Sequence, residues 1–236
     1  MRPTFPGLSK YDGGYAEYVL VPSYKFLIDA GTLDPREIAP LTDAGLTPYR
    51  AVKKVRHLLN PGSFALVSGV GGLGCYAIQY LKLLTQASVI SIVRSEEKQR
   101  LAKKMGSDFV INSRVDDVGK EIRDLTSNEG IDVAIDLVSS EETVQLATSN
   151  LAKRGTIVMV GLMGSSVRFP VIDAVLNEFN LMGSLWGNFN ELKEVIDLAK
   201  MKKIKSEITQ YKLEDANLVL DMLGRGKING RAVLVP

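Results

Sequence analysis

The stretch Ser68-Gly69-Val70-Gly71-Gly72-Leu73-Gly74 constrains this chain more than any other part of its sequence. An apolar run precedes it and apolar residues at helical spacing follow it, so the sequence predicts a strand, a glycine turn and a helix. Gly69, Gly71 and Gly74 fill the glycine positions of G-x-G-x-x-G, which allow a tight turn, close approach to a pyrophosphate, and close helix–strand packing. The free N–H groups of the helix start would face the phosphates. This context favours a dinucleotide site over a glycine-rich turn without a ligand.

Short apolar strands alternate with helices on both sides of this turn. We expect strands over residues 64–68, 88–93, 109–111, 131–136, 156–160 and 179–185, with a helix between each pair. Such alternation predicts an α/β fold, in which helices cover both faces of a parallel sheet. Six strands with a glycine turn after the first predict the doubly wound Rossmann arrangement.

The ends of the chain do not continue this alternation. Before the glycine turn, alternating and apolar residues predict a strand over 13–22 and a second short strand over 24–28. After it, we expect a helix over 190–201, a strand over 207–211, a helix over 214–223 and a strand over 231–235. We expect these last elements to pack on the residues that precede 45.

The composition excludes several classes of function. The formal net charge of the 236 residues is +2, which gives no electrostatic case for a nucleic-acid partner. One cysteine, Cys75, and one histidine, His57, cannot build a Cys/His zinc cage. No apolar run has the length of a membrane span, and the first residues carry no hydrophobic signal segment. We therefore expect a cytoplasmic protein with no membrane partner.

Several motifs occur together in one order along the chain. They are Gly13-Gly14-Tyr15-Ala16-Glu17-Tyr18, Asp43-Ala44-Gly45-Leu46-Thr47-Pro48-Tyr49-Arg50-Ala51, the glycine turn, Gly161-Leu162, Gly183-Ser184-Leu185-Trp186-Gly187 and Gly230-Arg231. With these motifs the chain resembles the zinc-containing medium-chain alcohol dehydrogenases, from about residue 7 onward. The resemblance implies hydride transfer between a nicotinamide cofactor and a small alcohol or carbonyl substrate, with zinc polarising the oxygen. It also implies a homo-oligomer, a dimer or tetramer, with dimerisation through the strand around 180–186.

The same family begins with a GroES-like catalytic domain, most of which has no counterpart in this sequence. We therefore expect three parts: a remnant of the catalytic domain at 1–44, the Rossmann domain at 45–185, and a return segment at 186–236 that packs on the remnant. A chain truncated in this way would have little or no activity alone. A separate chain carrying the N-terminal half could complement it.

One zinc position of the family has a counterpart here. The resemblance places a third protein ligand of zinc, usually Cys and in some members Asp, at Asp43. A carboxylate is a competent zinc ligand, but catalytic sites use about three protein ligands. The alternative is that Asp43 caps the helix that carries Thr47 and Tyr49. We do not expect this chain to hold zinc alone.

The end of the second expected strand bears on the choice of cofactor. Rossmann sites usually place Asp or Glu there, about 20 residues after the glycines, to bind the adenosine ribose 2′-OH. This chain has Val93, followed by Arg94 and then Lys98 one helical turn later. The two cations can bind a 2′-phosphate, which favours NADP(H) over NAD(H). The alternative is that Arg94 is solvated, with Glu96 and Glu97 offsetting its charge.

The resemblance also assigns residues to the nicotinamide half of the cofactor. They are Thr47, Val138, Val160, Gly161, Leu162, Leu185 and Trp186, while Arg231 would reach the pyrophosphate or the nicotinamide ribose. Val138 and Val160 end strands at the carboxyl edge of the sheet, where ligands of this fold bind. Trp186 could instead be a packing anchor or a lid on the substrate pocket.

Two other classes of function stay open. The chain could be a non-catalytic NAD(P)-binding module, or a subunit that needs a partner. It could also be a zinc-independent reductase similar to the quinone reductases, although Asp43 and residues 14–18 look more like the zinc branch.

Overall fold

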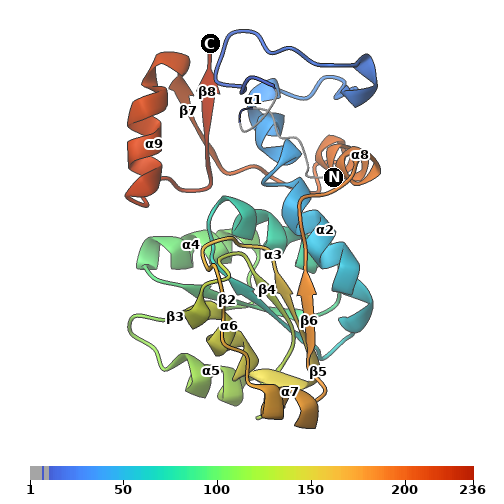
Figure 1. Ribbon diagram of the computed structural model, residues 1–236, viewed down its shortest axis with the longest axis vertical. Coiled ribbons are helices and arrows are strands. Elements are labelled where there is room, and N and C mark those ends of the chain that lie inside the picture. The colour runs from blue at the N-terminus through green and yellow to red at the C-terminus, as the bar shows by residue number, and fades with distance from the viewer. Residues whose placement is uncertain (1–6, 8–10) are drawn as a thin grey trace.

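The computed structural model describes residue 7 and residues 11–236. Its main feature is a parallel sheet of six strands in the order β3-β2-β1-β4-β5-β6 (Figure 1). The strands are β1 (Phe64–Ser68), β2 (Ser88–Val93), β3 (Phe109–Asn112), β4 (Ile131–Asp136), β5 (Leu151–Met159) and β6 (Asn180–Gly183). The strand order reverses between β1 and β4, and ligands of doubly wound sheets bind at the carboxyl ends of the strands around this point. The predicted α/β Rossmann fold is confirmed.

Helices cover both faces of the sheet and bury two apolar cores against it. On one face lie α2 (Leu46–Val55), α3 (Gly72–Leu84) and α4 (Glu96–Met105), and on the other lie α5 (Val118–Leu125) and α6 (Glu141–Thr148). Successive residues of β1 belong to different cores, because side chains alternate across a strand: Leu66 lies in the same core as Ile122 of α5, and Val67 lies in the same core as Tyr80 of α3. Each such buried side chain stabilises the fold by about 1.5–3 kcal/mol.

The helix starts differ in how their free N–H groups are satisfied. The Ser95 side chain accepts a hydrogen bond from the Lys98 N–H at the start of α4. Ser140 and Thr143 form a capping box at the start of α6. By contrast, Gly71 precedes α3 and supplies no side-chain acceptor. The first N–H groups of α3 are therefore available to a ligand.

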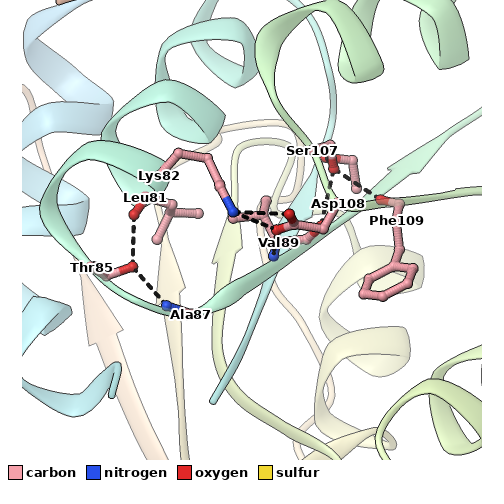
Figure 2. Close-up of polar contacts among 9 residues, drawn as sticks. Leu81, Lys82, Thr85, Ala87, Val89, Ser107, Asp108 and Phe109 are labelled. Atoms are coloured by element: carbon pink, nitrogen blue, oxygen red, sulfur yellow. Dashed lines mark hydrogen bonds and ion pairs between the residues drawn. The ribbon is translucent and has the colours of Figure 1, made fainter. Parts of the chain in front are cut away.

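Asp108 ties two strands and a helix together at the end of the sheet opposite the carboxyl edge (Figure 2). Its carboxylate accepts a hydrogen bond from the Val89 N–H at 2.7 Å and lies 2.9 Å from Lys82 Nζ of α3. The Ser107 hydroxyl donates to the carbonyl oxygen of Phe109 at 2.9 Å. These contacts fix β3 beside β2 and hold the end of α3 against both strands.

Most of the remaining elements form a smaller group at one end of the Rossmann sheet (Figure 1). This group consists of η1 (Tyr24–Phe26), α1 (Pro35–Ile38), η2 (Ala39–Thr42), α8 (Phe189–Lys200), β7 (Ile208–Lys212), η4 (Leu213–Asp215), α9 (Ala216–Gly224) and β8 (Arg231–Val235). The other two elements belong to the Rossmann part: η3 (Arg56–Leu58) continues α2, and α7 (Val171–Leu176) connects β5 to β6 at the opposite end of the sheet (Figure 1). Strands β7 and β8 pair in parallel, and β8 contacts η2. The Lys200 ammonium donates to the Asp29 carbonyl at 2.9 Å, and the Ser206 hydroxyl to the Glu37 carbonyl at 2.6 Å.

The two strands expected before residue 30 are wrong. Residues 13–22 form no ladder with any described residue, and a strand requires a partner for its backbone groups. Residues 24–26 form a 3₁₀ helix, because the Ser23 side chain caps the Lys25 N–H and the Leu27 N–H donates to the Tyr24 carbonyl. No helix within the described ranges combines the length and the apolar character that crossing a membrane requires.

Candidate dinucleotide-binding site

A cleft of about 430 Å³ opens at the carboxyl ends of β1, β2 and β4. The glycine turn forms one wall, the residues that follow β2 form a second, and the start of α6 forms a third. Eight of the predicted cofactor residues line it: Gly69, Gly71, Gly72, Leu73, Gly74, Arg94, Lys98 and Val138. The structure therefore brings together the residues that the sequence assigned to the phosphates, the ribose and the adjoining strand end.

The three glycines of the turn play different geometric roles. Gly69 has φ +93°, and a Cβ there would lie 2.8 Å from Val138 Cγ2. A Cβ on Gly74 would lie 2.3 Å from the Gly69 carbonyl oxygen, so only glycine lets α3 approach β1 this closely. A Cβ on Gly71 would meet nothing within 4 Å and would stand in free space at the cleft. Gly71 thus leaves room that the fold itself does not use, where a pyrophosphate can approach the backbone.

A buried hydroxyl at the same turn also points to a ligand. Ser68 ends β1, lines the cleft and is only 2% exposed, yet its Oγ has no hydrogen-bond partner among the described residues. Buried polar groups are nearly always hydrogen-bonded, so an orphaned hydroxyl beside the helix start fits a polar ligand. The uncapped start of α3, the space at Gly71 and this hydroxyl together fit a dinucleotide pyrophosphate.

The two cations predicted to bind a 2′-phosphate are both engaged. The Arg94 guanidinium forms an ion pair with Glu142 of α6, with Nη2 2.6 Å from Oε2. The Lys98 ammonium donates to the Ile228 carbonyl at 3.2 Å and to Asn229 Oδ1 at 2.8 Å. Both residues line the cleft. A 2′-phosphate would therefore compete with existing partners for each cation.

Asp136 shapes the wall of the cleft, although the sequence predicted no role for it. It is fully buried at the end of β4, and its Oδ1 accepts from the N–H groups of Val138 and Ser139, each at 2.9 Å. Its Oδ2 accepts from the Thr143 hydroxyl at 2.8 Å. Asp136 thus fixes Val138 and joins the loop after β4 to the first turn of α6. Its position at the end of a predicted strand was a signal that could have identified it.

A second cavity, of about 720 Å³, adjoins the loop after β5. Four residues assigned by resemblance to the nicotinamide half line it: Val160, Gly161, Leu162 and Leu185. Gly161 lies against the backbone of Val138, since a Cβ on Gly161 would fall 2.2 Å from the Val138 carbonyl oxygen. Val138 lines the first cleft and Ser139 lines the second cavity. The loop after β4 is therefore a shared wall between the two.

The residues around Asp43 do not fit a zinc site. Asp43 Oδ2 forms an ion pair with Arg231 at 2.8 Å, and Oδ1 accepts from the Thr47 hydroxyl at 3.3 Å. Both carboxylate oxygens thus have partners. Among residues 7 and 11–236, no group of three His, Cys, Asp or Glu side chains could hold a metal ion. A catalytic zinc needs about three protein ligands, so the described donor set falls short.

Trp186 and Arg231 lie at the junction between the sheet and the smaller group of elements. The Trp186 indole N–H donates to the Thr42 carbonyl at 3.0 Å, and Trp186 has φ +43°. The Arg231 side chain crosses the glycine turn, where a Cβ on Gly72 would lie 2.3 Å from Arg231 Cδ. Thr47 and Arg231 thus contact Asp43, Trp186 contacts the preceding residue, and none of the three lines the main cleft.

Comparison with known proteins agrees with this architecture. Residues 72–201 match the zinc-binding dehydrogenase family. The chain is 43% identical to an NAD-dependent alcohol dehydrogenase of Sulfurisphaera tokodaii over 99% of this chain and 67% of that protein. It is 36% identical to a D-arabinose 1-dehydrogenase (NADP(+)) of Saccharolobus solfataricus, over 95% of this chain and 65% of that protein. The crystal structure of an alcohol dehydrogenase from Aeropyrum pernix superposes with a TM-score of 0.88 at 40% identity, and the match covers 99% of this chain and 68% of that one. The chain thus spans about two thirds of the length of these relatives.

Proposed function

Because the chain belongs to the zinc-binding dehydrogenase family, we propose that it is an oxidoreductase chain of the alcohol dehydrogenase type that binds a nicotinamide dinucleotide. The supporting observation is the cleft at the glycine turn, with the uncapped α3 start, the open space at Gly71 and the unpartnered Ser68 hydroxyl. The reaction is hydride transfer between the nicotinamide ring, which supplies the redox chemistry, and a small alcohol or carbonyl compound.

The residues of the chain would divide the cofactor between two cavities. The α3 start and Ser68 would bind the pyrophosphate, and the walls at Arg94 and Glu142 would face the adenosine ribose. The nicotinamide half would lie toward Gly161 and Leu185, beyond the wall formed by Val138. The three-part division at residues 44/45 and 185/186 belongs to the same proposal.

We further propose that the cleft prefers NADP(H) to NAD(H). The end of β2 carries no carboxylate to repel a 2′-phosphate, since position 93 is valine and position 94 is arginine. Arg94 offers a planar, charge-assisted fork to a phosphate, and Lys98 offers a second positive charge nearby.

Fluorescence titration with NADPH and NADH tests both parts of this proposal. We expect both reduced dinucleotides to bind and NADPH to bind more tightly, with Arg94→Ala weakening NADPH selectively. Absence of binding by either dinucleotide would refute the assignment of the site. Tighter binding of NADH than of NADPH would refute the preference alone.

The donor set around Asp43 favours a second candidate function, a dinucleotide-binding subunit that needs a partner chain for zinc-dependent turnover. Both oxygens of Asp43 are engaged, and the described residues supply no three-ligand cluster. Metal analysis combined with an alcohol oxidation assay separates the two candidates. Stoichiometric zinc with turnover by this chain alone would exclude the second candidate, and binding of NADPH without metal or turnover would favour it.

We also propose a homo-oligomer that uses the outer edge of β6. Among the described residues, β6 pairs only with β5, and an edge strand presents unpaired backbone groups to another chain. Exposed apolar side chains lie on and near it: Ile172, Val175 and Leu176 of α7, and Leu181 of β6. Light scattering after size exclusion tests this, and a monomer at micromolar concentration would refute it.

We propose the cytoplasm as the location of the protein, because a single free cysteine suits a reducing compartment.

A further inference from the structure

The cleft contains one carboxylate side chain among its lining residues, and it lies at the mouth opposite Arg94. This is Glu142, in the first turn of α6, whereas Arg94 follows β2 on the facing wall. Glu142 Oε2 is 2.6 Å from Arg94 Nη2. The two residues are 48 positions apart in the sequence, so the pair joins two walls of the cleft.

The second cation at this end of the cleft has other partners. Lys98 Nζ is held by the Ile228 carbonyl and by Asn229 Oδ1, both in the loop before β8. These acceptors are neutral, so they hold the Lys98 ammonium in place without cancelling its charge. Of the two cations, only Arg94 has its charge offset by a carboxylate that lines the cleft.

We propose that Glu142 is a specificity-determining residue that limits the preference of this cleft for a 2′-phosphate by occupying and neutralising Arg94. This inference rests on the proposed dinucleotide function. A 2′-phosphate carries at least one full negative charge, so it is repelled by the Glu142 carboxylate and must displace it to reach the Arg94 fork. A free 2′-OH meets no such repulsion and can donate a hydrogen bond to a carboxylate. Glu142 thus supplies, from α6, the carboxylate that Rossmann sites usually carry after the second strand.

The exposure of the pair sets the size of the effect. The side chains of Arg94 and Glu142 are 59% and 68% exposed, so solvent screens their interaction. Removing the negative charge frees Arg94 and removes one repulsive charge, and for such an exposed pair we expect about fivefold tighter binding of NADPH. The affinity for NADH should not rise by more than about twofold, and it can fall, since NADH has no 2′-phosphate for Arg94 to bind.

The neighbouring residue provides a matched control. Glu141 also lies in the first turn of α6, but its carboxylate faces Arg168 at 3.4 Å and it does not line the cleft. Glu141→Gln and Glu142→Gln therefore remove the same charge from the same helix start. Any general effect on α6 stability or on the net charge of the protein appears in both variants.

The experiment measures the dissociation constants of NADPH and NADH by nicotinamide fluorescence, at low and at high salt. The proteins compared are the wild type, Glu141→Gln, Glu142→Gln, Arg94→Ala, and the double variant that combines Arg94→Ala with Glu142→Gln. We expect the ratio of NADH to NADPH dissociation constants to rise about fivefold in Glu142→Gln and not in Glu141→Gln. The gain should shrink at high salt and in the Arg94→Ala background.

Each other outcome has a definite meaning. If the wild type binds both dinucleotides and the two glutamine variants behave alike, the role of Glu142 is wrong and the proposed function stands. Equal tightening of NADH and NADPH in Glu142→Gln also overturns the inference, because a general charge effect would then account for it. If the wild type binds neither dinucleotide, both the proposed function and this inference fall.

Discussion

Two glycines of the same turn should separate binding from folding when each is replaced by alanine. In Gly74→Ala the new Cβ would lie 2.3 Å from the carbonyl oxygen of Gly69 and 3.1 Å from its carbonyl carbon. Ordinary contact begins near 3.4 Å, so α3 and the turn after β1 must separate by about 1 Å. Both groups are backbone, and neither can rotate away as a side chain would.

The expected loss of stability follows from this overlap. Overpacking of this kind costs about 1–3 kcal/mol, and the better helix propensity of alanine returns about 0.5–1 kcal/mol. A net loss of about 1–2 kcal/mol lowers the melting temperature of a chain of this size by about 2–8 °C. In Gly71→Ala the Cβ meets nothing within 4 Å and φ is −112°, so the melting temperature should change by less than about 2 °C.

Binding should show a different pattern. Gly71 leaves free space at the cleft, and a methyl group there keeps a pyrophosphate from the first N–H groups of α3. Losing one hydrogen bond to a charged group costs about 1.5–3 kcal/mol, which is about a 10- to 150-fold weaker affinity for NADPH. Thermal melts followed by circular dichroism and NADPH titrations of both variants provide the measurement. Wild-type affinity in Gly71→Ala, or wild-type stability in Gly74→Ala, would refute the reasoning.

Three further predictions follow from burial and hydrogen bonding. Burial raises the pKa of the Cys75 thiol to about 11, so a thiol reagent at pH 8 should modify the native protein at least about 100-fold more slowly than the protein unfolded in denaturant; equal rates would contradict it. Asp108→Ala leaves the buried Val89 N–H without that acceptor, so denaturant unfolding should show a loss of about 1–3 kcal/mol, and a smaller loss for Asp108→Asn, which keeps one acceptor oxygen. Burial raises the pKa of Tyr76 to about 12 and that of Tyr80 well above its ordinary value of 10. Both phenols are therefore neutral in the fold where the unfolded chain would ionise, so the contribution of each tyrosine to stability is complete below pH 10 and declines above it by about 1.4 kcal/mol per pH unit. The buried Cys75 thiol adds a decline of the same sign that begins near pH 9. Between pH 10 and 11, the free energy of unfolding should therefore fall less steeply with pH in Tyr76→Phe than in the wild type, and equal slopes would contradict this.

The sequence was sufficient for the sheet and for the glycine turn because their signals are local. An apolar run, three glycines at fixed spacing and a helical repeat all lie within about 20 residues, and short-range sterics decide their conformation. The segment at 13–22 shows the limit of such reasoning. Its alternation is typical of a strand, yet a strand exists only with a partner, and no described residue pairs with it.

The polar contacts of the site could not be predicted for a related reason. Arg94 is separated from Glu142 by 48 positions, and Asp43 from Arg231 by 188, so nothing in either neighbourhood identifies its partner. The unpartnered hydroxyl of Ser68 is equally invisible in the sequence, since it depends on what the fold places around that atom. The sequence therefore identified which cations lie at the cleft but not which carboxylates oppose them.

The loops around the cleft are joined mainly through backbone contacts that glycine permits. Gly74 lies against the Gly69 carbonyl, a Cβ on Gly69 would meet Val138, and Gly161 lies against the Val138 backbone. These contacts link the turn after β1, the loop after β4 and the loop after β5, and Asp136 anchors the middle loop by its hydrogen bonds. None of these three segments can therefore shift without moving the others, because backbone atoms in contact cannot move apart by a change of side-chain rotamer. The exposed side chains at the mouth have that freedom, so dinucleotide preference can change at Arg94 and Glu142 while the pyrophosphate position stays fixed.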